Sequence, residues 1–488
     1  MIDSVLAMKN SGFTEPEILD ENTTVGQWSH RGQVLFVLVH ILLGYLFRIY
    51  PEIVTIHAYT SLAFGLLFVL LDRQPKRVIY TAAYITGAEV IWRALDAAVF
   101  WETGKYGLIV LFSLSILKYG RGVRKAGWPV IYFTLLIPGI FIMPFFDRQE
   151  IAFNLAGPLA LALAVVFFSM LRIDQAVFKK ILVALLAPTT TLATYVLGNI
   201  LVSTNIIFGR SSNSQTSGDF GPNQVSVILA AGAFAAVYFA LLESNRLYKM
   251  FFLLLSLWLL GQSALTFSRS GLWVTGLSLG LTGLYLLQDS RKRLNFLIAS
   301  ILVGSLAYFF VLPVLESFTQ NAFSVRFVNM ELTGRNEIIK ADWMVFQRYP
   351  LFGVGPGQSK PLHALTYLAS NAHTEYSRML AEHGVLGLLS LMILIFIVFN
   401  RFISRIELAN KGYILGLTAW AILFMFVSGT RLVIPSLFFG LSAARFDLFS
   451  EKDKLNKFQP NSVVIFPYRR STQAGQGGKV NESTDCYN

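Results

Sequence analysis

Long apolar stretches recur along almost the whole chain, and they constrain its fold more than any other feature. A helix needs about 20 mostly apolar residues to cross the hydrocarbon core of a bilayer. Only 14% of the residues are charged, against about 25% in a typical soluble domain. This excludes a set of soluble domains, a disordered chain and a fibrous repeat. We predict an all-α polytopic membrane protein with about 12–14 transmembrane helices, the fourteen candidates being 33–50, 53–71, 78–100, 106–118, 128–146, 151–171, 181–199, 225–242, 250–267, 271–288, 294–312, 377–399, 412–428 and 430–449.

The orientation of these spans follows from the basic residues. Lys and Arg cluster in alternate short loops, beginning with Arg73, Lys76 and Arg77 between the second and third candidates. Cytoplasmic loops carry such an excess in membrane proteins. The pattern places both termini in the cytoplasm. It places three features outside, namely the loop 200–224, the break at 268–270 and the long loop 313–376. It also accounts for the net charge of +12 without a nucleic-acid partner.

The two ends of the chain differ from the apolar middle. Residues 1–32 are polar and acidic, and they lack the basic start and apolar run of a signal peptide. Residues 451–488 are polar, and we predict a disordered cytoplasmic tail there. The transmembrane domain is therefore predicted to cover 33–450. The single cysteine, Cys486, permits neither a disulfide within one chain nor a cysteine metal cluster.

Four arginines recur in the segments predicted to lie outside, where topology does not require them: Arg210, Arg269, Arg335 and Arg431. Each is a candidate for binding an anionic group, because a guanidinium binds phosphate and carboxylate oxygens through paired hydrogen bonds. The alternative is an arginine that pairs with a carboxylate or extends to the membrane interface.

Charged residues also occur inside the span 78–100. Glu89, Arg93 and Asp96 are spaced to lie on one helical face. Charges at the centre of a membrane cost at least about 2.5 kcal/mol each when unpaired, so we expect the three to neutralise one another. They form either a proton or substrate path, or a buried network that fixes helix packing. The lone histidines His40 and His57 are interpreted as packing residues.

The segment 333–388 is rich in motifs. Residues 336–347 are predicted to form an amphipathic helix on the membrane surface, and Tyr349-Pro350 ends it. GVGPG at 353–357 is predicted to form a tight turn. It is not a phosphate-binding loop, because no strand precedes it and no GK[ST] follows.

His373 stands where the chain re-enters the membrane. A histidine there can exchange a proton near neutral pH, or it can simply cap the helix. Glu375, Arg378 and Glu382 follow as a charge ladder. His363 lies in the same loop but has no obvious rigid support, and His383 falls more than two turns deeper. Clusters with metal-ligand spacing are not evident, so we predict chemistry without a metal or cofactor.

The ordered motifs between 208 and 390 resemble the O-antigen ligase and polymerase superfamily. SRSG at 268–271 resembles its serine–arginine motif, and GR at 334–335 with PLFGVGPG at 350–357 resembles its long-loop motif. His373-Thr374, nine residues and then Gly384-Val385-Leu386-Gly387 resemble its histidine–GxxG pattern. The family prefers Asn, Ser or Gln after the histidine, so Thr374 departs from it. The stretch 208–224 resembles its arginine-plus-PN loop.

The resemblance implies a GT-C-like glycosyltransferase of the bacterial inner membrane, with its active site facing the periplasm. The donor would be an undecaprenyl-diphosphate-linked glycan, and the acceptor a sugar hydroxyl of a glycolipid or glycan. Fixed guanidinium groups neutralise a diphosphate leaving group, and a base activates a hydroxyl. The predicted catalytic residues are His373, Arg269 and Arg210, and the predicted substrate-binding residues are Arg335, Arg431, Glu375 and Arg378.

Alternatives remain at this point. A polymerase would use the same donor chemistry, although the histidine–GxxG spacing favours a ligase that joins the glycan to lipid A-core or a similar acceptor. A protein-glycosylating enzyme is a third option. A transporter for the same lipid-linked glycan would instead need a charged path through the bundle, built on Glu89, Arg93 and Asp96, and no catalytic histidine.

Overall fold

Helices make up most of the chain that the computed structural model describes, which is residues 17–19, 29–120, 127–209, 211–288, 290–328, 335–364, 374–403, 408–428 and 431–449. Nine helices in these residues are long and apolar enough to cross a membrane. Helices α4, α5 and α11 have 19, 17 and 18 residues and also match predicted spans. With these three, twelve described helices of at least 17 residues match predicted spans. The all-α polytopic membrane fold is therefore confirmed.

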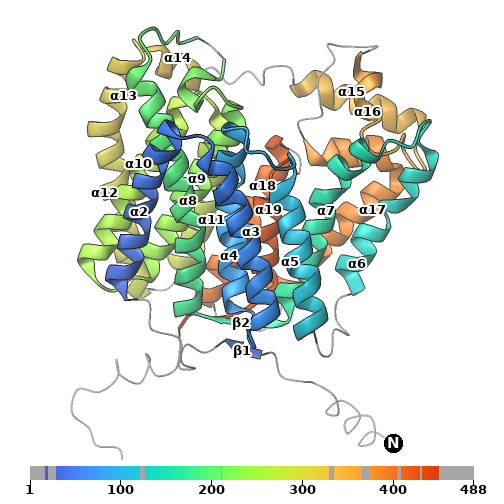
Figure 1. The fold of residues 1–488 in the computed structure, drawn as a ribbon, viewed down its shortest axis with the longest axis horizontal. Helices are drawn as coiled ribbons and strands as arrows, with labels where there is room; N and C mark the ends of the chain where they lie inside the picture. Colours follow the sequence, from blue (N-terminus) through green and yellow to red (C-terminus); the bar gives the residue numbers. More distant parts are fainter. Residues whose placement is uncertain are drawn as a thin grey trace, which may run out of the picture. The chain divides into compact units, whose positions relative to one another are not determined.

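Figure 1 shows the arrangement of the helices. Their bounds are α2 His30–Ile49, α3 Ile53–Leu71, α4 Lys76–Ala94, α5 Thr103–Tyr119, α6 Gly127–Thr134, η1 Ile137–Ile142, α7 Arg148–Ser169, α8 Gln175–Val202, η2 Gln215–Ser217, α9 Pro222–Leu242, α10 Arg246–Leu265, α11 Arg269–Leu286, α12 Ser290–Leu306, η3 Ala307–Val311, α13 Leu312–Phe318, α14 Ala322–Val328, α15 Arg335–Arg348, α16 Ser359–Ala364, α17 Glu375–Ile403, α18 Leu408–Ser428 and α19 Ile434–Ala443.

Three predicted spans differ from the observed elements. The candidate 128–146 is split into α6 and η1, and Pro138 near the start of η1 has no N–H to continue an α-helix. The candidate 78–100 ends as a helix at Ala94, because a turn follows. The candidate 430–449 contains the short helix α19. Its 10 residues rise about 15 Å, which is half the thickness of a bilayer core.

Eight helices form a closed circuit of neighbours. Each packs on the next in the order α8, α9, α11, α18, α19, α7, α5, α4 and back to α8. Small residues allow close approach between such helices. A Cβ at Gly271 of α11 would overlap the backbone of Ser226 in α9, for example. Helices α2 and α3 pack outside this circuit on α8 and α4, and α17 packs on α6, α15 and α18.

A small parallel sheet marks one end of the bundle, which we call the sheet end. It contains β1 (Glu17–Leu19), β2 (Leu171–Asp174) and β3 (Arg445–Asp447), in that order. Helices α15 and α16 lie at the opposite end, the α15 end (Figure 1). Helix α17 connects the two, since its first residues contact α15 while Arg401 donates to the carbonyls of Ser442 and Ala444 beside β3.

Candidate active site

The turn between α10 and α11 is fixed to the start of α9 by serine hydroxyls. Ser268 occupies the N-cap position of α11 and donates to Oδ1 of Asn223 at 2.7 Å. The backbone N–H of Gly271 donates to the Ser226 hydroxyl at 3.3 Å. The serine–arginine and Pro–Asn motifs are therefore one structural unit. Arg269 is the first residue of α11, and its side chain is half-buried next to this unit.

The loop after α8 is anchored to the same turn. The backbone N–H of Asn213 donates to the Thr266 carbonyl at 2.9 Å, and the Thr216 hydroxyl donates to the Leu265 carbonyl at 2.5 Å. Arg210 belongs to this loop but lies outside the described residues, so its position stays a prediction. The anchoring nevertheless ties the described part of its loop to the turn that carries Arg269.

Helix α14 also packs against the turn between α10 and α11. Phe323 packs with Ala264 and Phe267 in an apolar cluster, and Nε of Arg326 donates to the Phe267 carbonyl at 3.1 Å. The segment after α10 is thus held on two sides. Arg335 is the first residue of α15, and its role stays a prediction.

The first turn of α17 is held by a carboxylate from α15. The Ser377 backbone N–H donates to the Thr374 hydroxyl at 3.0 Å, which caps the helix. The Ser377 hydroxyl donates to Oδ2 of Asp342 at 2.6 Å, and Oδ1 of Asp342 lies 2.7 Å from Nε2 of His363. Asp342 and His363 are both buried. The expectation that His363 lacks rigid support is therefore wrong, because α16 and Asp342 hold it.

The predicted charge ladder forms along the next two turns of α17. Arg378 donates to Glu375 at 2.5 Å and to Glu382 at 2.7 Å, and it also reaches Oδ1 of Asn154 in α7 at 3.2 Å. All four side chains are buried. Two carboxylates therefore share one guanidinium.

The glycine-rich turn docks onto a break in α17. The predicted tight turn at 353–357 is present, and its backbone N–H at Gly355 donates to the Glu382 carbonyl at 2.9 Å. At Gly384 the helix is interrupted by φ 60° and ψ −139°, a conformation that favours glycine. Three glycines of the turn also have positive φ, namely Gly353, Gly355 and Gly357.

Arg93, at the end of α4, joins the α9–α11 unit to the loop before α19. Its Nη1 donates to Oε1 of Gln224 at 3.3 Å and to the Arg431 carbonyl at 3.0 Å. Burial lowers the pKa of Arg431, the charge of Arg378 lowers it further, and Glu375 acts in the opposite direction. Arg431 therefore lies in the electrostatic field of the charge ladder, and the contacts from the Ser268 turn run as far as the Arg431 backbone.

The charges of the span 78–100 are paired, but not in the predicted set. Arg93 donates to Glu89 at 2.7 Å and to Glu102 at 3.3 Å, and Lys105 lies 2.6 Å from Glu102. The expectation that Asp96 joins this stripe is wrong, because α4 ends before it and Asp96 is exposed with φ 47°. Two cations and two carboxylates neutralise one another between α4 and α5, which favours the packing interpretation.

Comparison with protein families agrees with these motifs. Residues 252–392 match the family model described as O-Antigen ligase. This match covers less than a third of the chain, and it supports the O-antigen ligase superfamily. It supports a membrane glycosyltransferase of the O-antigen ligase or polymerase type. A comparison with curated proteins found no match.

The O-antigen ligase segment contains five of the seven predicted site residues, namely Arg269, Arg335, His373, Glu375 and Arg378. Arg210 and Arg431 lie outside it in sequence. The contacts described above connect the loop of Arg210 and the backbone of Arg431 to the same end of the bundle. His373 lies outside the described residues, and its described neighbour Thr374 is buried at the cap of α17.

Two residues of the candidate active site were not identified from the sequence, namely Asn154 and Asp342. Asn154 gave no signal, because its partner Arg378 is 224 residues away. Asp342 gave one, since it shares a helical stripe with Ile338 and Val345, and a carboxylate on an apolar stripe indicates a buried partner. The helix predicted over 336–347 was instead expected to have Trp343 on its apolar side, but Trp343 is 50% exposed.

Proposed function

We propose that this protein transfers a glycan from an undecaprenyl-diphosphate carrier to a sugar hydroxyl, as a step of lipopolysaccharide or surface-polysaccharide assembly. The observation that carries the proposal is the contact chain from Ser268 through Asn223, Gln224 and Arg93 to Arg431. It links the serine–arginine motif to the Pro–Asn motif and to the loop of Arg431. We further propose the bacterial inner membrane as the location, with both termini cytoplasmic and the α15 end facing the periplasm.

In the proposed reaction the arginines bind the donor diphosphate. Arg269 and Arg210 clamp the phosphate oxygens, because planar guanidinium groups form paired hydrogen bonds with them. Arg335 and Arg431 add positive charge at the rim. As the glycosyl bond breaks, negative charge grows on the leaving diphosphate, and pre-positioned cations stabilise that charge in the transition state.

His373 is the proposed general base. It accepts the proton of the acceptor hydroxyl as the oxygen attacks the anomeric carbon of the donor sugar. Glu375 and Arg378 hold the helix end that follows it and contribute to binding through their charges. The proposed scheme needs neither a metal nor an organic cofactor.

Ligase and polymerase activities differ in the acceptor. The histidine–GxxG spacing favours a ligase acting on lipid A-core or a similar glycolipid, and a polymerase that extends the lipid-linked glycan is the alternative. A transporter is disfavoured, because Arg93 pairs with Glu89 and Glu102 instead of lining a path with Asp96.

The decisive experiment is product analysis with the purified full chain. It is incubated with a lipid-linked glycan and lipid A-core, with and without EDTA. A ligase yields glycosylated acceptor and free undecaprenyl diphosphate in equal amounts, and a polymerase yields a longer lipid-linked glycan. Neither product from a correctly folded preparation contradicts the proposed function. Loss of the products in EDTA contradicts the proposed metal-independent chemistry.

The proposed orientation is tested by labelling single cysteines in a Cys486→Ser background with an impermeant maleimide. Gln347 in α15 and Arg246 at the start of α10 are both exposed, so Gln347→Cys and Arg246→Cys form a matched pair. We expect modification from the periplasm at 347 only. Modification at 246 only would reverse the proposed orientation.

A further inference from the structure

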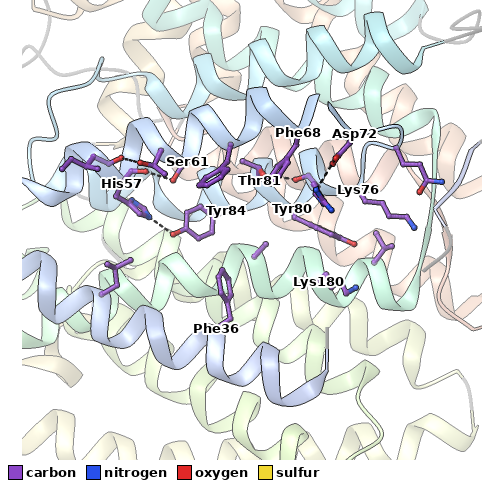
Figure 2. Close-up of a pocket in the computed structure, with 18 of the residues that line it drawn as sticks. Phe36, His57, Ser61, Phe68, Asp72, Lys76, Tyr80, Thr81, Tyr84 and Lys180 are labelled. Carbon is purple, nitrogen blue, oxygen red and sulfur yellow. Dashed lines mark hydrogen bonds and ion pairs between the residues drawn. The ribbon is translucent and has the colours of Figure 1, made fainter. Parts of the chain in front are cut away.

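A cavity of about 1170 Å³ lies between α2, α3, α4 and α8, apart from the candidate active site. Ligand pockets for small molecules measure about 300–1,000 Å³, so this space is larger than most. Figure 2 shows its lining, with His57 and Tyr84 at one end and Asp72, Lys76 and Lys180 towards the other. The second group belongs to the sheet end, because Lys180 follows β2 by six residues.

The mouth at the sheet end is basic. Among the described residues, four cationic side chains line it, Arg73, Lys76, Arg77 and Lys180, and one carboxylate, Asp72. Asp72 lies 3.4 Å from Arg77, and the described lining residues carry more positive than negative charge. Basic pockets between membrane helices bind anionic lipid head groups.

The interior beyond this mouth is mostly apolar. Aromatic rings line it from two sides, including Phe36 of α2 with Phe64 and Phe68 of α3. Along α3 the lining extends from Asp72 past His57 to Ile53, a rise of about 22 Å to His57 and about 28 Å in all. One leaflet contributes about 15 Å to the hydrocarbon core of a bilayer. The groove therefore has room for an acyl chain whose head group stays at the mouth.

Two lining residues of the groove, His57 and Tyr84, belong to a chain of hydrogen bonds. Trp92 Nε1–H donates to Nδ1 of His57 at 2.9 Å, and His57 Nε2–H donates to the Tyr84 hydroxyl at 2.6 Å. The Tyr84 O–H then donates to Nε2 of His40 at 2.9 Å, and His40 Nδ1–H donates to the Phe36 carbonyl at 2.8 Å. Indole N–H is donor-only, so Nδ1 of His57 accepts and the imidazole of His57 is neutral. These polar atoms all have hydrogen-bond partners, so this part of the groove can contact a hydrocarbon chain.

We propose that this groove holds one anionic glycerophospholipid from the leaflet at the sheet end. Its phosphate lies among Arg73, Lys76 and Lys180, and one acyl chain extends along α3 towards His57. The inference does not depend on the proposed glycosyltransferase activity. It assigns helices α2, α3, α4 and α8, which precede the O-antigen ligase segment, a lipid-binding role of their own.

The test is lipid titration of the purified full chain in detergent, followed by native mass spectrometry. Palmitoyl-oleoyl phosphatidylglycerol is compared with the zwitterionic phosphatidylcholine of the same chains. We expect one tightly held phosphatidylglycerol per chain and at least tenfold weaker retention of phosphatidylcholine. Equal retention of both lipids, or none of either, would overturn the proposal. Inorganic phosphate should not displace the lipid, and displacement would reduce the site to one for free anions.

Two variants separate the mouth from the interior. Arg73→Gln/Lys76→Gln/Lys180→Gln should weaken phosphatidylglycerol binding by about a hundredfold, at about fivefold per cation. Thr60→Trp fills the interior with the charges intact and should weaken the binding of both lipids. Unchanged phosphatidylglycerol binding in either folded variant contradicts the assignment.

Matched controls use residues outside the lining. The charge control is Arg246→Gln/Lys249→Gln/Arg293→Gln, whose positions at the starts of α10 and α12 are absent from the lining. The size control is Leu254→Trp, at a residue that is 54% exposed on α10. Both should bind as the parent does. Equal loss in a control and its test variant would show non-specific binding and overturn the site.

Discussion

Arg93 donates a 3.0 Å hydrogen bond to the backbone carbonyl of Arg431, although 338 residues separate the two. The same guanidinium donates to Glu89 at 2.7 Å and reaches Gln224. A buried cation that binds several elements in this way fixes their relative positions. The loop that carries Arg431 is therefore attached to α4 and α9 at the end where the candidate active site lies.

Replacing Arg93 should destabilise the protein strongly. Arg93→Ala leaves Glu89 and Glu102 buried without their guanidinium partner, and breaking a buried pair costs about 3–5 kcal/mol. Arg77→Ala is the control, since its pair with Asp72 is partly exposed and such pairs contribute about 1 kcal/mol or less. Thermal unfolding in detergent measures both. Equal effects would contradict the role assigned to the Arg93 network.

Asp342 should act as a positioning residue. Asp342→Asn keeps the shape but lowers hydrogen-bond strength to His363 and Ser377, since bonds to charged groups are about twice as strong. We expect glycan transfer to slow about tenfold while donor affinity stays near the parent value, because the start of α17 next to His373 loosens. Glu337→Ala, at an exposed residue of the same helix, should have no effect. A parent-like transfer rate in Asp342→Asn would refute this role.

Gly384 should tolerate no side chain. Its φ of 60° and ψ of −139° are costly for other residues, and a Cβ there would stand 2.5 Å from the Pro350 carbonyl oxygen. Gly384→Ala should lower the free energy of unfolding by at least about 1–3 kcal/mol. Gly276→Ala is the control, because a Cβ at this α11 position meets nothing within 4 Å. A neutral Gly384→Ala would contradict the docked break.

The spans could be predicted because their signal is local. Candidate 53–71 coincides with α3, and the bounds of α9, α10 and α11 fall within a few residues of prediction, since hydropathy alone decides burial in a bilayer. The i, i+4 pairing of Glu89 with Arg93 was predictable for the same reason.

The long-range contacts could not be predicted from such local signals. Whether Asp96 joins the stripe depends on where α4 ends, and a turn with positive φ removes it. His363 depends on Asp342, 21 residues earlier, and on α16, which has six residues. The break at Gly384 depends on the turn at 353–357 docking against it. Each outcome is set by tertiary packing.

Arg269 should be required as an arginine. Arg269→Lys keeps the charge but loses the planar fork, and each hydrogen bond to a charged group contributes about 1.5–3 kcal/mol. Binding of the lipid-linked donor should weaken by about tenfold to a hundredfold. Arg148→Lys, at an exposed residue that begins α7, should bind as the parent does. Full donor binding and transfer in Arg269→Ala would refute the clamp.

The most direct test of the account measures donor binding and glycan transfer in one preparation of His373→Ala. Loss of a general base costs about a hundred- to ten-thousand-fold in rate, whereas the arginines remain in place. We predict that transfer falls by this factor while affinity for the undecaprenyl-diphosphate-linked glycan stays within about twofold of the parent. Transfer near the parent rate, or loss of donor binding together with transfer, would contradict His373 as the base.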